Sequence, residues 1–173
     1  MKRVLFLLGH LNDRDIEWMM HNGHKESIRE GDILIHRDEE LENLYIVLSG
    51  ELTVRDGVSN LHEIASIGPG EVLGEMSLLE ARPPSVSVTA TEPCELYVIP
   101  RESIEGRMQA DLQFRANFYY ALALFLSDRL RKTTDQLGYG DPSEVDVVDT
   151  NVLDGVAQGG ARFSRILKKF SEV

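Results

Sequence analysis

Cysteine and long hydrophobic runs are both scarce in this sequence. Its single cysteine, Cys94, cannot form a disulfide within the chain, and it is expected to be a small buried residue of a strand. The apolar stretch at residues 4–8 is too short for the hydrophobic region of a secretory signal peptide and for a membrane-spanning helix. These absences predict a cytoplasmic protein that does not insert into a membrane.

Positive charge is also in deficit. The chain has 18 Lys and Arg residues against 29 Asp and Glu residues, which gives a formal net charge of −11. A protein that binds nucleic acid needs Lys and Arg to displace counterions from the phosphates, and an anionic membrane surface attracts basic chains rather than acidic ones. Nucleic acid and anionic lipid are therefore not expected as partners.

Motifs that indicate catalysis or metal binding are missing as well. No nucleophile elbow, Walker loop or pair of catalytic carboxylates can be assembled from the sequence. His21 and His24 are three residues apart, but Gly23 separates them and no third ligand is evident. We therefore expect no enzyme activity, no catalytic residues, no metal and no cofactor.

The chain does contain a regular succession of short strands. Its 173 residues, of which 42% are hydrophobic and 7% aromatic, suffice for one domain with a core of Leu, Ile and Val. A short helix at residues 13–20, with Asn12 or Asp13 as its cap and Gly23 after its end, precedes the strands. Alternating apolar residues separated by turns predict strands at 33–36, 44–48, 51–54, 62–67, 85–90 and 96–99. This pattern is typical of an antiparallel β-roll, a double-stranded jelly-roll.

The pattern becomes helical after Pro100. A short helix begins at Arg101, and residues 112–137, which contain no Gly or Pro, form a long amphipathic helix. The predicted fold class is therefore mainly β, with an N-terminal helix and a long C-terminal helix. The apolar stripe of the long helix predicts a homodimer; the stripe consists of Phe118, Leu122, Phe125, Leu126 and Leu130.

The C-terminal residues divide into two further segments. One domain is expected over residues 1–138, an acidic linker over 139–160 and an amphipathic helix over 161–173. The apolar face of that helix either folds back onto the domain or docks into a groove of an unidentified protein partner. The face consists of Phe163, Ile166, Leu167 and Phe170. Three glycines are expected to loosen the junction: Gly155, Gly159 and Gly160.

One segment in the middle of the chain has a distinctive sequence. Residues 70–79, Gly-Glu-Val-Leu-Gly-Glu-Met-Ser-Leu-Leu, resemble the phosphate-binding cassette of cyclic nucleotide-binding domains. Residues 30–35 and 44–52 are similar to the strand sequences that precede the cassette in that family. The two helices after Pro100 fall where the family, which includes the catabolite activator protein, has its B and C helices. The resemblance covers residues 5–138 and implies a β-roll that binds a cyclic nucleotide.

The resemblance also implies which residues contact the nucleotide. Gly74 permits close approach of the backbone, and Glu75 accepts a hydrogen bond from the ribose 2′-hydroxyl; without a ligand, Glu75 would complement the dipole of the helix that starts there. Thr133 and Thr134 match positions whose hydroxyls reach adenine, one from each subunit of a dimer, although Thr pairs also occur on solvated helix faces. The candidate ligand-binding residues are Gly74, Glu75, Met76, Ser77, Arg82, Ser85, Val86, Thr133 and Thr134.

One position departs from the family pattern. Pro84 stands where nucleotide-binding members have an Arg that pairs with the cyclic phosphate, and proline offers neither charge nor a donor. Hydrogen bonds to ionised groups are worth about 1.5–3 kcal/mol, so the expected affinity falls by roughly tenfold to a hundredfold. Ser85 remains where the bacterial transcription-factor branch has a phosphate-contacting Ser. Arg82 either reaches the same anion or is a solvated loop charge.

Together, these features predict a stand-alone regulatory module that senses a cyclic nucleotide, with cyclic AMP as the expected ligand, and relays it to a protein partner. A transcription factor of this family needs a winged-helix domain after the long helix, and the 35 residues after Gly138 are fewer than the usual domain minimum of roughly 50. Two alternatives stay open. Pro84 favours a degenerate, nucleotide-free β-roll that serves as a protein-interaction scaffold, and a different anionic nucleotide is the other alternative.

Overall fold

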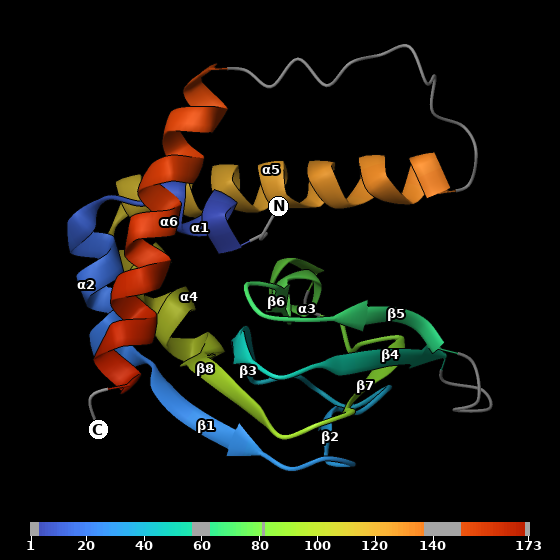
Figure 1. The fold of residues 1–173 in the computed structure, drawn as a ribbon. Helices are drawn as coiled ribbons and strands as arrows, with labels where there is room; N and C mark the ends of the chain where they lie inside the picture. Colours follow the sequence, from blue (N-terminus) through green and yellow to red (C-terminus); the bar gives the residue numbers. More distant parts are fainter. Residues whose placement is uncertain (1–3, 57–62, 81, 137–149, 172–173) are drawn as a thin grey trace.

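The computed structural model describes residues 4–56, 63–80, 82–136 and 150–171, and it combines two sheets with a layer of helices (Figure 1). The strands are β1 (His24–Ile28), β2 (Ile33–Ile35), β3 (Asn43–Ser49), β4 (Leu52–Asp56), β5 (Glu63–Ile67), β6 (Val72–Leu73), β7 (Val86–Ala90) and β8 (Cys94–Pro100). The helices are α1 (Val4–His10), α2 (Asp13–Asn22), α3 (Glu75–Glu80), α4 (Arg101–Ala110), α5 (Leu112–Gln136) and α6 (Thr150–Ser171). The mainly β fold with flanking helices is confirmed.

The strands form the two walls of a β-roll. One four-stranded sheet has the order β1-β8-β3-β6 and the other has the order β2-β7-β4-β5. The strand pairs are antiparallel; Tyr45 lies opposite Val98 in the first sheet, and Leu52 lies opposite Ala90 in the second. The inward side chains of both sheets form one apolar core. Cys94 belongs to that core and is 1% exposed, so the expectation of a buried strand cysteine is confirmed.

The two sheets differ in what covers their outer faces. The five residues of the apolar run 44–48 in β3 are all buried. Tyr45 and Val47 face the other sheet, whereas the residues that alternate with them pack against the helices. A strand buried on both faces needs a continuous apolar sequence, which this run supplies. In the other sheet, four of the five residues of β5 are exposed.

The N-terminal residues form two helices, of which α1 packs against α5 and α6 and α2 packs against β8 of the first sheet. Asn12 caps α2 together with Asp15 in a capping box, and Gly23 follows the last turn, so this predicted helix is confirmed. The apolar stretch 4–8 belongs to α1, and Val4, at its start, is buried. The backbone N–H of Val4 donates to the carbonyl oxygen of Gly70 at 2.8 Å. This bond joins α1 to the first residue of the candidate cassette.

The long helix α5 confirms its predicted length, but its apolar stripe has another use. Phe118, Leu122 and Phe125 are each 1% exposed because they belong to the core between the helices and the first sheet. The sequence predicted that a second copy of the chain covers these three side chains, but they are buried within the chain itself and are not available to it. Leu130, in contrast, is 68% exposed.

Within the described residues, neither α5 nor any other helix combines the length and hydropathy that crossing a membrane requires.

The predicted linker over residues 139–160 is wrong in its second part, because α6 begins at Thr150. Residues 139–149 lie outside the described part of the chain. Two of the three glycines expected to loosen this region instead allow α6 to cross α1 at close range: a Cβ atom added at Gly159 would overlap the carbonyl oxygen of Leu5, and Gly155 packs against Gly9. A glycine that looks like a chain breaker in sequence is here a contact between two helices.

The C-terminal helix folds back onto the domain, which confirms one of its two interpretations. Phe163 and Ile166 are 4% and 0% exposed within the helical core. The guanidinium of Arg162 donates to the carbonyl oxygens of Leu8 and Leu11, both at 2.6 Å, and pairs with Asp13 at 2.9 Å. A cation at the last carbonyls of a helix is favourable, so Arg162 helps to hold α6 at the end of α1. The side chain of Phe170 lies outside the described residues.

Candidate functional site

The middle of the candidate cassette contains a turn that only glycine can occupy. Gly74 lies between β6 and α3 with a φ of +91°, in the left-handed region that side chains rarely adopt. A Cβ atom at this position would also lie 2.6 Å from the carbonyl oxygen of Asn43. The turn therefore requires glycine for two independent reasons. It places Glu75 at the first position of α3, as the sequence predicted.

A cavity of about 340 Å³ opens beside this turn. Its volume falls within the range of roughly 300–1,000 Å³ that is typical of small-molecule sites. Seven of the nine predicted ligand-binding residues line it, together with Pro84 and Arg129. The seven are Gly74, Glu75, Met76, Ser77, Arg82, Ser85 and Val86.

The Glu75 carboxylate is the most deeply buried charge of this cavity. The residue is 2% exposed, and its Oε1 accepts a hydrogen bond from Nη1 of Arg129 at 2.6 Å. Arg129 comes from α5, and its side chain is 37% exposed. A short bond between two ionised groups is among the stronger hydrogen bonds in proteins. The ion pair therefore fastens the far part of α5 to the cassette.

Arg129 is the site residue that sequence reasoning missed. Its signal lies in helical spacing: Arg129 precedes Thr133 by four residues, so the two share one face of the helix. Once Thr133 is a candidate, the preceding turn of that face also points toward the cassette. Following the helix face of Thr133 back by one turn leads to Arg129.

The two threonines do not line the cavity in the single chain. The hydroxyl of Thr133 donates to the carbonyl oxygen of Arg129, and that of Thr134 donates to the carbonyl oxygen of Leu130, both at 2.9 Å. Both bonds lie within α5. The contact of these hydroxyls with adenine stays a prediction.

The loop after the cassette contains both Pro84 and Arg82. Pro84 lines the cavity, and its carbonyl oxygen accepts the backbone N–H of Asp38 at 2.9 Å. This bond ties the loop to the connection between β2 and β3. Arg82 lines the same cavity and also a second one, so it is positioned at the boundary between them.

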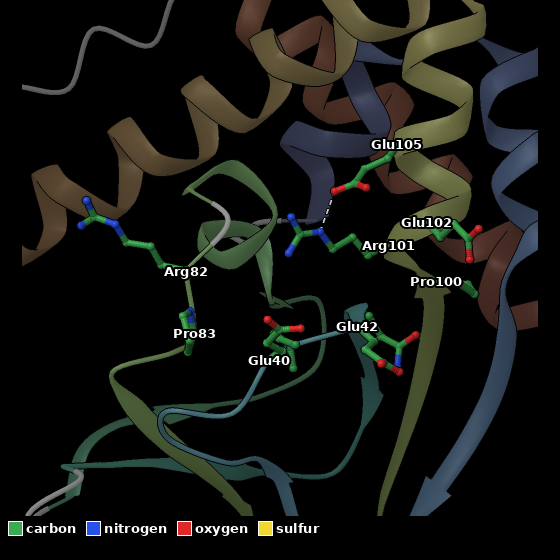
Figure 2. A pocket seen from close by; sticks show the side chains of 10 residues that line it. Glu40, Glu42, Arg82, Pro83, Pro100, Arg101, Glu102 and Glu105 are labelled. Atoms are coloured by element: carbon green, nitrogen blue, oxygen red, sulfur yellow. Dashed lines mark hydrogen bonds and ion pairs between the residues drawn. The ribbon is translucent and has the colours of Figure 1, made fainter.

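The second cavity is larger, at about 500 Å³, but its lining is unsuited to a phosphate (Figure 2). Four glutamates line it: Glu40, Glu42, Glu102 and Glu105. Arg101 also lines it, but its Nε is paired with Glu105 at 2.6 Å. Figure 2 shows the Arg82 side chain extending away from Glu40 and Glu42. Because carboxylates repel an anion, the smaller cavity is the better nucleotide site.

A comparison with protein families agrees with this geometry. Residues 25–111, half of the chain, match the family model of the cyclic nucleotide-binding domain. The chain belongs to the cyclic nucleotide-binding domain family. The matched segment begins in β1 and ends at Asp111, so it contains the β-roll, the cassette and α4.

Individual relatives of this cyclic nucleotide-binding domain include kinase regulatory proteins. It is 31% identical over 97 residues to a cAMP-dependent protein kinase regulatory subunit of Yarrowia lipolytica, which is 56% of this chain and 25% of that protein. A solved structure of the regulatory domain of Toxoplasma gondii PKA with cAMP is 28% identical, with a TM-score of 0.56 over 61% of this chain and 42% of that chain. The domain thus spans a quarter of the curated relative.

The fold also resembles that of a bacterial regulator. The catabolite activator protein of Thermus thermophilus has a TM-score of 0.62 and 22% identity, over 96% of this chain and 87% of that chain. At this level of identity the likeness concerns the fold alone.

Proposed function

We propose that this cyclic nucleotide-binding domain senses cyclic AMP and relays its binding to a protein partner. The observation that carries the proposal is the cavity in which the cassette residue Glu75 meets Arg129 of α5. A ligand in that cavity touches both the β-roll and the long helix. Binding there can therefore change how α5 sits on the roll, which a partner can detect.

In the proposed complex, the ribose 2′-hydroxyl donates to Glu75, as the family resemblance implies. The carboxylate is already oriented by Arg129 and does not have to be ordered on binding. The phosphate lacks the usual Arg because of Pro84, and the replacements available in the cavity are Arg82 and Ser85. The adenine lies toward α5, where Thr133 and Thr134 supply hydroxyls, one from each subunit of a dimer.

The experiment that tests this function is isothermal titration with cyclic AMP and with cyclic GMP. We expect saturable binding of cyclic AMP that the Glu75→Ala variant loses. Glu102→Ala is the matched control, because Glu102 lines only the carboxylate-rich cavity. Equal binding by wild type and Glu75→Ala would contradict the assigned site.

One observation favours a second candidate function. Pro84 removes the family's phosphate-pairing Arg, so a nucleotide-free β-roll that serves as a protein-interaction scaffold is the alternative. In that case, neither nucleotide gives heat at millimolar concentration. The titration therefore separates the two functions directly.

We further propose a homodimer through α5, by a face that shares only Leu126 and Leu130 with the predicted stripe and excludes its buried phenylalanines. Apolar residues recur on this face at alternating intervals of four and three residues, the spacing of a coiled-coil seam. Most of them are exposed; Leu112 is 67% and Leu130 is 68% exposed. The seam consists of Leu112, Ala116, Tyr119, Ala123, Leu126 and Leu130.

Light scattering at micromolar concentration tests the dimer. We expect a mass of twice 19.5 kDa for the wild type and a monomer for Leu130→Glu. Ile64→Glu is the control, since Ile64 is 58% exposed but lies on β5, away from the seam. A wild-type monomer would refute the seam.

Absence of catalytic activity, absence of nucleic-acid binding and a cytoplasmic location stay predictions from the sequence.

A further inference from the structure

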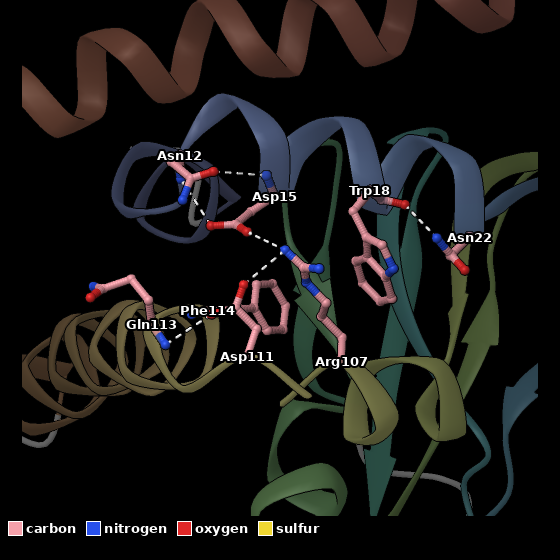
Figure 3. A network of polar contacts seen from close by, with 8 residues as sticks. All are labelled: Asn12, Asp15, Trp18, Asn22, Arg107, Asp111, Gln113 and Phe114. Carbon is pink, nitrogen blue, oxygen red and sulfur yellow. Dashed lines mark hydrogen bonds and ion pairs between the residues drawn. The ribbon is translucent and has the colours of Figure 1, made fainter. Parts of the chain in front are cut away.

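The ends of three helices meet at the guanidinium of Arg107 (Figure 3). Its Nη2 lies 3.2 Å from Oδ1 of Asp15 and 3.1 Å from Oδ2 of Asp111. Asp15 is in the first turn of α2 and Arg107 is in the last turn of α4. Asp111 is the residue between α4 and α5. One cation thus connects the N-terminal helices to the junction from which the long helix departs.

Two aromatic rings lie beside this guanidinium. Its central carbon lies 5.5 Å from the ring centroid of Phe114 and 6.0 Å from that of Trp18. The two rings also contact each other edge to face, with centroids 5.5 Å apart. A planar, forked cation can pair with two carboxylates while it stacks on rings, and the compact ammonium of a lysine cannot reproduce this geometry.

Asp111 also contacts the first turn of α5. Its Oδ1 accepts the backbone N–H groups of Gln113 and Phe114, both at 3.0 Å, and so caps the first turn of the helix. Its Oδ2 faces Arg107. The same carboxylate therefore orients the start of α5 and holds it to α4 and α2.

A small rotation at this base has a large effect at the nucleotide cavity. Arg129 lies nearly five turns beyond Leu112, which is about 25 Å at the rise of an α-helix, so a rotation of about 10° displaces it by about 4 Å. Its bond to Glu75 is only 2.6 Å long. A displacement of this size separates the two groups.

We infer that Arg107 is a positioning residue that directs α5 so that Arg129 reaches Glu75. Arg107 touches neither of those residues and acts through Asp111 and the body of the helix. The ion pair between Arg129 and Glu75 is formed by two residues of the chain itself, so the positioning role can be tested without a nucleotide. Its consequence for nucleotide affinity rests on the proposed function.

The test compares Arg107→Lys and Asp111→Asn with the control Arg101→Lys. Arg101 is another arginine of α4 that forms an ion pair, but its partner in that pair, Glu105, belongs to the same helix. Asp111→Asn keeps an oxygen that can cap α5 and loses the charge that faces Arg107. Trp18, the only tryptophan of the chain, reports a change at Arg107 through its fluorescence emission. The guanidinium hydrogens of Arg129, observed by NMR in the ligand-free protein, report its pairing with Glu75.

We expect Arg107→Lys and Asp111→Asn to lose the slow exchange of the Arg129 guanidinium hydrogens, with a shift in Trp18 emission in Arg107→Lys. Arg101→Lys should change neither signal. Unaltered Arg129 signals in a folded Arg107→Lys protein would overturn the inference, whether or not Trp18 responds. If Arg107→Lys does not fold, Asp111→Asn alone decides in the same way.

A titration with cyclic AMP separates this inference from the proposed function. We expect Arg107→Lys to bind several-fold more weakly than Arg101→Lys. Loss of the Arg129 signals in Arg107→Lys, without nucleotide binding by any variant, would refute the sensor and support the positioning role. Equal affinity in the two variants together with unaltered Arg129 signals would refute the positioning role and leave the sensor in place.

Discussion

Two buried carboxylates, Asp15 and Glu75, have similar settings and different uses. Each lies in the first turn of a helix, and they are 1% and 2% exposed. Each pairs with one arginine, Asp15 with Arg107 at 3.2 Å and Glu75 with Arg129 at 2.6 Å. The two arginines stand on either side of the α4–α5 junction. In charge, burial and pairing, the two sites are close to equivalent.

They differ in what surrounds the carboxylate. Asp15 completes the capping box of α2, where its second oxygen accepts the backbone N–H of Asn12, and its arginine is enclosed by aromatic rings. Glu75 lines a cavity of about 340 Å³. Burial and an arginine partner therefore do not identify a ligand site by themselves. The open volume beside Glu75 is what gives its carboxylate something to bind.

Replacing Asp15 should have the largest effect on stability. We expect Asp15→Ala to lower the free energy of unfolding by about 3 kcal/mol, because it leaves the half-enclosed Arg107 without a buried partner and removes the capping box. Asp13→Ala is the control, since Asp13 belongs to the same helix but its side chain is 76% exposed; its cost should stay below about 1 kcal/mol. Equal losses in urea unfolding would show that burial of the pair is irrelevant.

The next largest effect is expected in the cavity that Glu75 lines, when the arginine that Pro84 replaces is restored. We expect Pro84→Arg to strengthen cyclic AMP binding by roughly tenfold to a hundredfold, since a charge-assisted bond to phosphate is worth about 1.5–3 kcal/mol. Pro83→Arg is the control, because it adds the same charge one residue away. If both variants gained equally in calorimetry, general attraction of the anion would explain the result rather than a specific contact.

The comparison also shows why the sequence predicts one of these sites and not the other. Glu75 lies within a recognisable local segment, in which Gly74 and the following helix are neighbours along the chain. The Asp15 network joins residues from three helices. Its members are up to 99 positions apart in the sequence, from Asp15 in α2 to Phe114 in α5. Local patterns contain no record of such pairs. Arg129 was missed for a different reason: its helical spacing from Thr133 is a local signal, but the face of the helix was not followed back by one turn.

The strands and the long helix were predictable because their periodicity is local. What periodicity does not reveal is which apolar face of an element meets which neighbour. Phe118 and Leu130 look alike in the stripe of α5, yet one is 1% and the other 68% exposed. Gly155 and Gly159 likewise signal a break until the partner helix α1 is known, and then they signal close packing. Tertiary contacts decide both cases.

Removing the arginine of the second pair should cost less stability than removing Asp15. We expect Arg129→Gln to lower the free energy of unfolding by about 1 kcal/mol, because the amide of Gln can still donate a hydrogen bond to the buried Glu75 carboxylate although the charge is lost. Cyclic AMP affinity should fall more visibly, since a neutral amide holds Glu75 less firmly than the guanidinium does. Arg131→Gln, on an exposed position of the same helix, is the control. A stability loss as large as that of Asp15→Ala would mean that both pairs are structural.

The smallest effect is expected when the pH is lowered, at the ion pair between Arg107 and Asp111. The backbone N–H of Phe114, and after it the Arg107 guanidinium, hold the pKa of Asp111 below its ordinary value of 3.8. A carboxylate with a lowered pKa stabilises the fold above that ordinary value, and the contribution is lost as the pH falls through the folded-state pKa. The stability difference between wild type and Asp111→Asn should therefore shrink between about pH 5 and pH 3. A difference that stays constant in urea unfolding over this range would mean that the charge of Asp111, as opposed to its capping oxygen, contributes nothing to the junction.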